Sequence, residues 1–304
     1  MKIAYLISAY TDAPHLLRLV DALDAEADFY VHVDRRVSDA PFRAALQGRR
    51  NVHFLPARHA VLWGDITQVG YQRDLLRAAL DSGESYGRLC LISGTDYPLW
   101  SNTHIQQFFT QHADRDFIIG QDLTHLTPHE TRFYRTWRPQ MWLPLLPEKY
   151  NLKVRHLVRS VLHALGLRKR LTLQVDGSEW HVFHGSDYWA LRPATARTLL
   201  ETLDAHPALW RFFSTMFTPS EAVWQTLLFN NPLLAPHAEQ QPAPYKGLWA
   251  LTPLHFIDYS NGILVLTAED LPRLLESGKM FCRKCTTGKS DALMDLIDAE
   301  RAES

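Results

Sequence analysis

The chain is poor in the features that mark several large classes of protein. It has three cysteines in 304 residues, Cys90, Cys282 and Cys285, so it lacks the dense, paired cysteines of a disulfide framework. Its charges nearly cancel, with 33 acidic against 32 basic side chains and a formal net charge of -1. This balance gives no support to the binding of a nucleic acid or another polyanion over the whole protein surface. Apolar runs such as residues 3–7 are far too short to cross a bilayer.

Two further absences concern targeting and common catalytic motifs. Met1 and Lys2 lead directly into a strand-like segment, with no apolar region followed by a small-residue cleavage site, so we expect a cytoplasmic protein that begins at Met1. The sequence contains no Gly-x-x-x-x-Gly-Lys loop, no Gly-x-Gly-x-x-Gly and no His-Glu-x-x-His, which removes three frequent phosphate and metal motifs.

Cys282 and Cys285 form a Cys-x-x-Cys pair around Arg283 and Lys284. Such a pair is typical of redox or zinc sites. A second ligand pair at finger-like spacing is missing, and two cations between the thiols would oppose metal binding. Two incidental thiols are therefore the favoured interpretation, and we expect no metal at this position.

Composition and periodicity indicate one globular α/β domain. Hydrophobic residues make up 46% and charged residues 21% of the chain, ordinary values for a globular protein of this length. Within residues 1–121, apolar strand-like runs alternate with helix-period segments, which predicts a Rossmann-like, mostly parallel sheet with helices on both faces. The expected strands are residues 3–9, 29–33, 52–55, 89–92 and 117–119. The expected helices are residues 15–23, 42–46, 66–80 and 105–109.

The character of the sequence changes after residue 121. Within residues 122–176, tryptophan, proline and arginine crowd together at 131–139, and a basic helix-like stretch at 153–170 follows. We interpret this region as an insertion over the sheet edge on the acceptor side, where loops commonly carry specificity. Further expected strands are 181–191, 254–259 and 263–266. Further expected helices are 194–203, 221–229, one after residue 268, and 291–300.

Two candidate ligand-binding groups follow predicted strands. Ligands of such sheets sit beyond the carboxyl ends of the strands, and Asp34 and the turn Ser93-Gly94-Thr95-Asp96 fall at that edge. Asp34 is placed to accept a hydrogen bond from a base or ribose, and Asp96 to bind a sugar hydroxyl. The alternatives are that Asp34 caps the next helix and that Asp96 stabilises its own turn.

Glu221 is the candidate general base. Ser220 is placed to cap a helix with Glu221 in its first turn, where the helix dipole would lower the pKa of the carboxyl and only burial would offset this. Simple compensation of the dipole is the alternative role. Arg283 and Lys284 form a basic cluster suited to a diphosphate leaving group, with a solvated charge run as the alternative.

Seven short segments in one order resemble the core-2/I-branching glycosyltransferase family, which includes β1,6-N-acetylglucosaminyltransferases and protein O-xylosyltransferases. They are residues 4–7, 32–35, 61–64, 93–98, 185–189, 219–224 and 281–284. The resemblance implies a GT-A type fold, a UDP-sugar donor, inversion at the anomeric carbon and no divalent cation.

The resemblance also implies roles for individual residues. Asp34 matches the aspartate that contacts the nucleoside, Glu221 the catalytic base, and Lys284 the lysine that holds the diphosphate, with Arg283 as a helper. Other positions match motifs on the donor side (Trp63, Gly64, Ser93, Asp96) and on the strand beside the acceptor (Tyr188, Trp189). Arg132 and Arg135 are candidate contacts for an anionic acceptor, or else pair with Glu130.

The sequence departs from the family at one point of the donor site. Some animal members use a second cation, an arginine just before the strand that corresponds to residues 263–266, where this chain has Asn261-Gly262. Animal members are also membrane-anchored and disulfide-rich, so the resemblance here is to a bacterial-type cytoplasmic enzyme.

The sequence therefore predicts a single domain over residues 1–304, with a nucleotide-binding half at 1–121 and an acceptor-binding and catalytic half at 122–304. The predicted activity is metal-independent, inverting transfer of N-acetylglucosamine or xylose from a UDP-sugar to a hydroxyl of a glycan or lipid-linked surface saccharide, as in polysaccharide biosynthesis. The alternatives are a catalytically silent nucleotide-sugar or glycan-binding protein, and a hydrolase in which Glu221 activates water. The basic stretch 153–170 adds an expected peripheral contact with the membrane.

Overall fold

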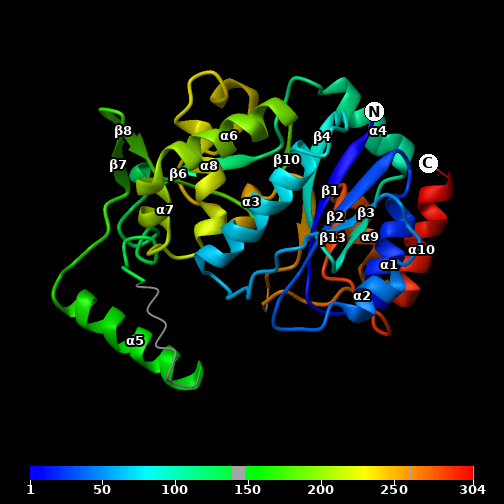
Figure 1. The fold of residues 1–304 in the computed structure, drawn as a ribbon, viewed down its shortest axis with the longest axis horizontal. Helices are drawn as coiled ribbons and strands as arrows, with labels where there is room; N and C mark the ends of the chain where they lie inside the picture. The colour runs from blue at the N-terminus through cyan, green and yellow to red at the C-terminus, as the bar shows by residue number, and fades with distance from the viewer. Residues whose placement is uncertain (139–147, 261, 304) are drawn as a thin grey trace.

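The computed structural model describes residues 1–138, 148–260 and 262–303. Its centre is a five-stranded sheet in the order β10-β4-β1-β2-β3. The strands β1 (Ile3–Ala9), β2 (Ala27–Val33), β3 (Val52–Phe54) and β4 (Arg88–Ser93) run parallel, and β10 (Ala190–Leu191) is antiparallel to β4. The predicted α/β class, with a mostly parallel sheet and helices on both faces, is confirmed (Figure 1).

Alternation along the buried strands explains the two helical layers. Successive side chains of a strand point to opposite faces, so in β1 Ala4 and Leu6 join the hydrophobic cluster around α3 (Ile66–Leu80), whereas Tyr5 and Ile7 join the cluster on the other face. The helices on that second face are α1 (Ala13–Leu23), α2 (Ala40–Ala45) and α4 (Asn102–Gln111).

The remaining strands form small sheets beside the central one. β6 (Ile119–Asp122) pairs with β9 (Phe183–His184) and β11 (Glu239–Gln240), and β13 (Phe281–Arg283) pairs with β5 (Asp96–Pro98) and β12 (His255–Ile257). β7 (Thr172–Val175) and β8 (Ser178–His181) form a hairpin. In the antiparallel pair β13–β5, Arg283 stands opposite Asp96, so the end of the chain is brought to the turn after β4.

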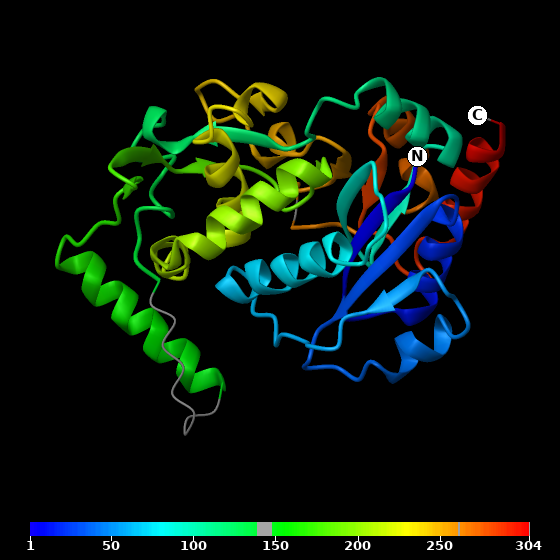
Figure 2. The same cartoon turned by 45° about the horizontal axis from the view of Figure 1, so that its top comes forward.

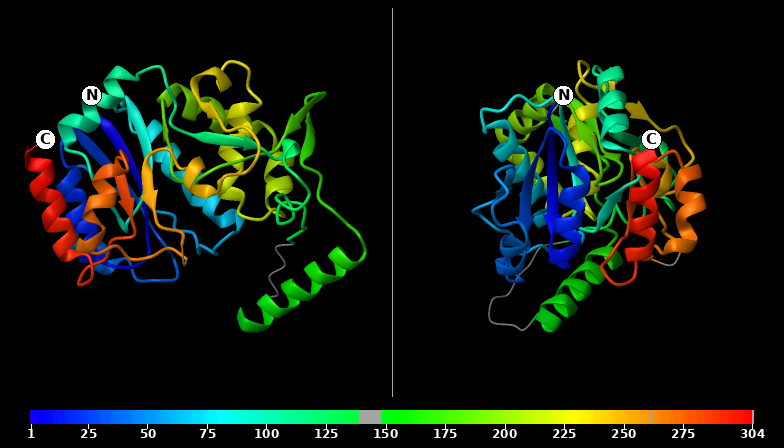
Figure 3. Two further views of the ribbon diagram at one scale, coloured as in Figure 1. Left: turned by 180° about the vertical axis from the view of Figure 1, so that it is seen from behind. Right: turned by 90° about the vertical axis from the view of Figure 1, so that its right-hand side faces the viewer.

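The helices of the second half are α5 (Glu148–Ala164), α6 (Pro193–Ala205), α7 (Pro207–Phe213), α8 (Val223–Phe229), α9 (Leu271–Glu276) and α10 (Asp291–Glu303). Short 3-10 turns lie between them, at η1 (Leu123–His125), η2 (Pro219–Glu221), η3 (Ala235–His237), η4 (Leu248–Leu251) and η5 (Ala268–Asp270). In the views of Figures 1, 2 and 3, α5 stands away from the body of the molecule. Among the described residues, no helix is both long and apolar enough for a bilayer span.

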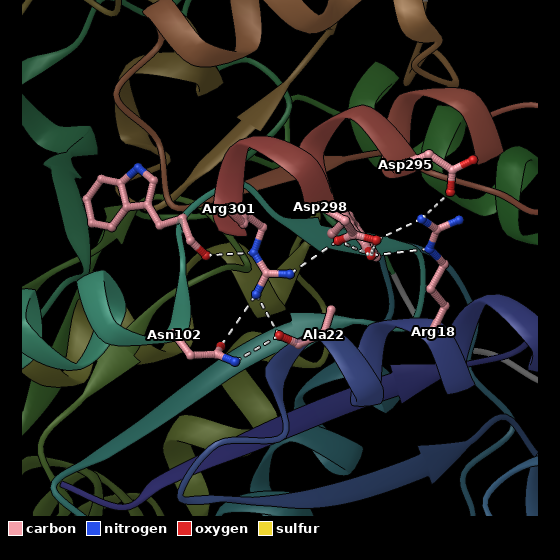
Figure 4. A network of polar contacts seen from close by, with 8 residues as sticks. Arg18, Ala22, Asn102, Asp295, Asp298 and Arg301 are labelled. Carbon is pink, nitrogen blue, oxygen red and sulfur yellow. Dashed lines mark hydrogen bonds and ion pairs between the residues drawn. The ribbon is translucent and has the colours of Figure 1, made fainter. Parts of the chain in front are cut away.

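Helix α10 is held on the first half of the chain by a polar network (Figure 4). Arg301 donates to the carbonyl oxygens of Ala22 at 2.6 Å and Trp100 at 2.9 Å. Arg18 of α1 donates to Asp295 at 2.7 Å and Asp298 at 2.8 Å. These contacts fix the C-terminal helix beside β13 and its neighbours.

The structure corrects four expected elements. The run 181–191 is not one strand, because β9 ends at His184 and the loop 185–189 bends before β10. Residues 263–266 form no strand, because the N–H groups of Leu264 and Leu266 bond to two different segments, at Asp258 and Lys284, and build no ladder. The strand expected at 117–119 is β6, which begins at Ile119. The helix expected at 221–229 begins at Val223, after the turn η2.

Candidate active site

A cavity of about 330 Å³ opens at the carboxyl ends of the parallel strands. Ser8, Asp34 and Ser93 reach it from the ends of β1, β2 and β4, and Asp187, Tyr188 and Arg283 close its other side. Trp63 and Arg36 also line it. This is the place where the fold class predicts a ligand.

Asp34 is a buried carboxylate fixed by Arg36. The backbone N–H of Arg36 donates to it at 2.9 Å and the guanidinium at 2.8 Å. Burial works to raise the pKa of Asp34, but the hydrogen bonds from Arg36 outweigh it and hold the pKa below its usual value. Asp34 does not cap the next helix, because Asp39 occupies the N-cap of α2. An ionised acceptor thus faces the cavity at the position that the family resemblance assigns to the nucleoside.

Trp63 lines the cavity, and Gly64 follows it in the chain without lining the cavity itself. The Trp63 side chain is exposed and meets Phe217 edge to face at 5.8 Å between ring centroids. Gly64 adopts a φ of 69°, a left-handed conformation that glycine takes without strain, and its N–H donates to Gln68 at 2.6 Å. This turn presents the indole of Trp63 to the opening.

Asp96 does not reach the cavity, which corrects its predicted role as a direct donor contact. It is fully buried, and its carboxylate accepts from the Ser93 N–H at 2.7 Å and from Arg283 Nη1 at 2.8 Å, with His255 Nε2 at 3.1 Å. Burial works to raise the pKa of Asp96, but Arg283 and His255 hold it below its usual value. Asp96 therefore acts as the anchor of Arg283.

Arg283 is the cation of the C-terminal cluster that lines the cavity. It is buried, donates to Thr95 Oγ1 at 2.9 Å as well as to Asp96, and lies over the Tyr188 ring at 5.4 Å from the centroid. Lys284 is half-buried and does not line this cavity. That Lys284 holds the diphosphate stays a prediction, and Arg283 is the residue of the pair that lines the cavity.

Glu221 lies in the 3-10 turn η2, which corrects the expected helical position. Ser220 makes no side-chain cap to η2 or α8, so the dipole argument does not apply. The Glu221 side chain is 18% exposed and does not itself line the cavity, although Asp187, whose charge acts on it, does. Burial raises the pKa of this carboxyl to about 8, and the Asp187 carboxylate adds to the rise. A carboxylate with a raised pKa is a suitable general base near neutral pH.

His184 supports Glu221 from β9. Its Nδ1 lies 3.9 Å from Glu221 Oε2, and the Tyr134 hydroxyl lies 3.0 Å from the same ring nitrogen. Burial lowers the pKa of His184 to about 4, so the ring is neutral at pH 7 and does not form an ion pair with Glu221.

Asp187 is a site residue that the sequence analysis missed. It lines the cavity, and Gln72 Nε2 lies 3.4 Å from its Oδ1. Gln72 is itself fixed by Trp224, whose Nε1 donates to its Oε1 at 2.6 Å. Burial raises the pKa of Asp187, while Arg283 works to lower it. The signal was present in Gly185-Ser186-Asp187-Tyr188-Trp189, where only the two aromatic residues were singled out.

The residues that were predicted to contact the acceptor lie in different parts of the structure. Tyr188 lines the cavity on the donor side. Trp189 is fully buried and packs against Trp224 at 6.0 Å between ring centroids, so its assignment to the acceptor is wrong. Arg132 lines a second cavity of about 350 Å³. Arg135 donates to Thr131, and Glu130 accepts from Thr127 and Tyr245.

Two short patterns that resemble catalytic motifs have structural roles. Residues 114–116 have the sequence Asp-Arg-Asp, a spacing at which carboxylates are able to share a metal ion, but Asp116 is buried and binds Arg192 at 2.8 Å and Thr195 at 2.7 Å. Residues 83–87 have the sequence Gly-Glu-Ser-Tyr-Gly but connect a helix to a strand, the reverse of a nucleophile elbow. The thiols of Cys282 and Cys285 are buried 3.7 Å apart.

Comparison with known proteins identifies a family for most of this chain. The model of the Core-2/I-Branching enzyme family matches residues 3–241. Xylosyltransferase 2 of Homo sapiens is 26% identical over 242 residues, which cover 76% of this chain and 25% of that protein. Xylosyltransferase 2 of Mus musculus is 25% identical over 246 residues, 77% of this chain and 25% of that protein. The chain spans about a quarter of the length of these curated relatives.

Solved structures show only a distant likeness. A putative glucose-1-phosphate thymidylyltransferase from Bacillus anthracis aligns with a TM-score of 0.35 and 10% identity, over 80% of this chain and 87% of its own. Mannose-1-phosphate geranyltransferase from Thermus thermophilus aligns with a TM-score of 0.31 and 12% identity, over 74% and 72%. Likeness at this level carries no argument about activity.

Proposed function

The chain belongs to the Core-2/I-Branching enzyme family, and from that premise we propose that it is an inverting glycosyltransferase. It moves N-acetylglucosamine or xylose from a UDP-sugar to a hydroxyl of a glycan or lipid-linked surface saccharide, in polysaccharide biosynthesis. The observation that carries the proposal is one cavity at the strand ends that is lined by both Asp34 and Arg283. Asp187 lines it as well, and its charge interacts with the charges of Arg283 and Glu221.

Glu221 takes the proton of the acceptor hydroxyl. The hydroxyl oxygen forms a bond to the anomeric carbon from the face opposite UDP, the bond from that carbon to the diphosphate oxygen breaks, and UDP leaves with the electron pair. A positioned base contributes roughly 10²–10⁴ in rate. The burial that raises the pKa of Glu221 makes it basic enough for this step.

Arg283 stabilises the charge that develops on the departing diphosphate. A guanidinium is able to bind two phosphate oxygens at once, and the anchor of Arg283 on Asp96 at 2.8 Å fixes its position before the reaction. Arg36 is the second cation at this cavity and takes part of the role that an arginine fills in other members. We propose that transfer proceeds with these cations and without a divalent metal.

The test of the base is Glu221→Gln. We expect a loss of about 10²–10⁴ in kcat, because glutamine cannot accept the hydroxyl proton, with little change in UDP-sugar affinity. Transfer is measured with radiolabelled UDP-N-acetylglucosamine and UDP-xylose, and affinity by thermal shift. Glu269→Gln, at an exposed position in η5, is the matched control. An unchanged kcat would remove Glu221 from the role, and donor binding without transfer or hydrolysis in the wild type would favour a silent binding protein. Hydrolysis far faster than transfer would favour a hydrolase.

We also propose that α5 brings the enzyme to the surface of an anionic membrane, near a lipid-linked acceptor. Leu157 and Val161 of α5 and Leu165 directly after its end are exposed at intervals of four residues, so the two helical residues share one side of the helix axis. Lys153 of α5 is exposed, as are Arg168 and Arg170 in the segment that follows the helix. Exposed leucine and valine beside cations suit the boundary between headgroups and acyl chains.

A further inference from the structure

Three side chains with metal-binding atoms lie together away from the donor cavity. Asp122 is at the end of β6, His125 is in the adjoining turn η1, and His181 is at the end of β8. One carboxylate oxygen and one ring nitrogen from each histidine all lie within 4.8 Å of one another. No step of the proposed transfer uses these residues.

The distances among these atoms are close to those of ligands around one ion. Asp122 Oδ2 lies 2.7 Å from His181 Nδ1 and 3.8 Å from His125 Nδ1. Zinc binds carboxylate oxygen and imidazole nitrogen at about 2.0–2.2 Å, so neighbouring ligand atoms of one tetrahedral ion stand about 3.4 Å apart. The two observed separations fall on either side of that value, and small side-chain rotations bring them to it.

Asp122 Oδ2 and His181 Nδ1 are hydrogen-bonded to each other, and the Thr124 hydroxyl lies 3.2 Å from the same nitrogen, so an ion would take the place of the proton that these atoms share. Asp122 Oδ1 is occupied by the backbone N–H and the hydroxyl of Thr124, at 2.8 and 2.6 Å, so Oδ2 faces the two rings. Asn230 fixes the backbone of His181, accepting its N–H at 2.9 Å and donating to its carbonyl at 2.8 Å. Such outer contacts orient the ligands of metal sites.

The exposure of these three side chains to solvent distinguishes a metal site from a simple hydrogen bond between Asp122 and His181. The side chain of Asp122 is 10% exposed, while those of His181 and His125 are 38% and 71% exposed. A hydrogen bond between Asp122 and His181 would explain the positions of those two side chains but not the position of His125. With an ion, two nitrogens and one oxygen bind on one side, and water completes the shell from the open side.

We propose that Asp122, His125 and His181 bind a divalent transition-metal ion of the zinc class. Two imidazoles and one carboxylate suit zinc and its neighbours, whereas Ca²⁺ and Mg²⁺ require mainly oxygen ligands. The ion would join the two ends of the acceptor-side insertion, since residues 123–180 leave from Asp122 and return at His181. It would thereby link the two ends of this long segment of the chain.

The experiment uses the tag-free protein after removal of metals. Co²⁺ titration followed by visible absorption reports the geometry of the ligands, and Zn²⁺ calorimetry reports stoichiometry and affinity. We expect one ion per chain, with the affinity for Zn²⁺ at least 10-fold weaker in His125→Ala and in Asp122→Asn, and 10–100-fold weaker in Thr124→Ala, which loosens the carboxylate. A bound ion should also raise the melting temperature.

Two controls make the result specific. His129→Ala, at an exposed histidine four residues from His125, should bind Zn²⁺ like the wild type, and so should a variant with both Cys282→Ser and Cys285→Ser. The absence of saturable binding, or binding that persists in a chain with both His125→Ala and His181→Ala, would overturn the proposal. Calorimetry and the cobalt spectrum do not depend on catalysis, so these outcomes are distinct from a failure of the proposed transferase activity.

Discussion

At the scale of single residues, the proposed base Glu221 and its neighbour Asp187 are two carboxylates with raised pKa values. Glu221 and Asp187 are both shielded from water, which disfavours their charged forms, and each charge makes the other less favourable. Such a pair titrates as a unit. Protons therefore leave it at a higher pH than from an isolated carboxyl group, and the active, deprotonated form of Glu221 accumulates as the pH rises.

This coupling predicts a shift in the pH profile of Asp187→Asn. The wild-type kcat/KM should rise with pH as Glu221 loses its proton, with a midpoint near the raised pKa of about 8. Removal of the Asp187 charge lowers the pKa of Glu221, so the rising limb should move to lower pH. The measurement is kcat/KM between pH 5.5 and 9.5. A limb that stays in place would show that Asp187 does not act on Glu221 through its charge.

The sequence indicated which residues follow the predicted strands but gave less information about which way their side chains point. Asp34 and Ser93 follow predicted strands, and the parallel sheet brings both to one cavity. Which of Arg283 and Lys284 faces that cavity depends on the pairing of β13 with β5, a contact over almost 190 residues that no local pattern encodes. Trp189 was assigned to the acceptor side by its match to a family motif, but an aromatic side chain at that position fits a hydrophobic core equally well.

At the scale of elements, prediction succeeded where hydrophobic periodicity was long. β1 and α3 have the predicted bounds, residues 3–9 and 66–80. The second half relies on strands of two to four residues, such as β9 and β10, which are too short to show alternation. Their positions come from contacts with distant segments, such as the bond from the Gly185 N–H to the Glu221 carbonyl at 2.8 Å.

Close packing around β9 predicts a large cost for Gly185→Ala. A Cβ at this position would lie 2.1 Å from the Ile119 carbonyl oxygen, and backbone atoms of a packed strand cannot easily move away. We expect a loss of roughly 3 kcal/mol or more in the free energy of unfolding, measured by urea denaturation. Gly177→Ala is the matched control, because its Cβ meets open space at a φ of 79° and strain alone costs about 1 kcal/mol. Equal losses would contradict the packing argument.

At the scale of the whole molecule, the cavity lies where separate hydrophobic clusters meet. The cluster around α3 and α8 carries η2 with Glu221, and the cluster beneath α10 includes Cys282 and Cys285, which flank Arg283. That residues 1–304 form one domain with halves at 1–121 and 122–304 stays a prediction. The proposed base Glu221 and the cation Arg283 therefore adjoin different hydrophobic clusters. The distance between these two side chains depends on how the clusters pack against each other.

The projecting helix α5 predicts selective binding to anionic vesicles. Each basic residue near such a surface contributes about 1 kcal/mol, which salt screens. We expect co-sedimentation with vesicles containing phosphatidylglycerol at low salt, little with phosphatidylcholine alone, and release at 0.5 M salt. Changing both Leu157→Glu and Val161→Glu should abolish binding, whereas Leu233→Glu, at an exposed leucine elsewhere, should not. Equal binding to neutral vesicles would contradict the charge argument.

The pairing of β13 with β5 has a consequence during translation. Arg283 enters the cavity from a strand that the ribosome makes 187 residues after its anchor Asp96. A nascent polypeptide that has folded its parallel sheet still lacks this guanidinium. The cavity is therefore complete only after residue 283 has been made, and a product that ends before this residue would keep Asp96 with its contacts to Ser93 and His255 but without its guanidinium partner.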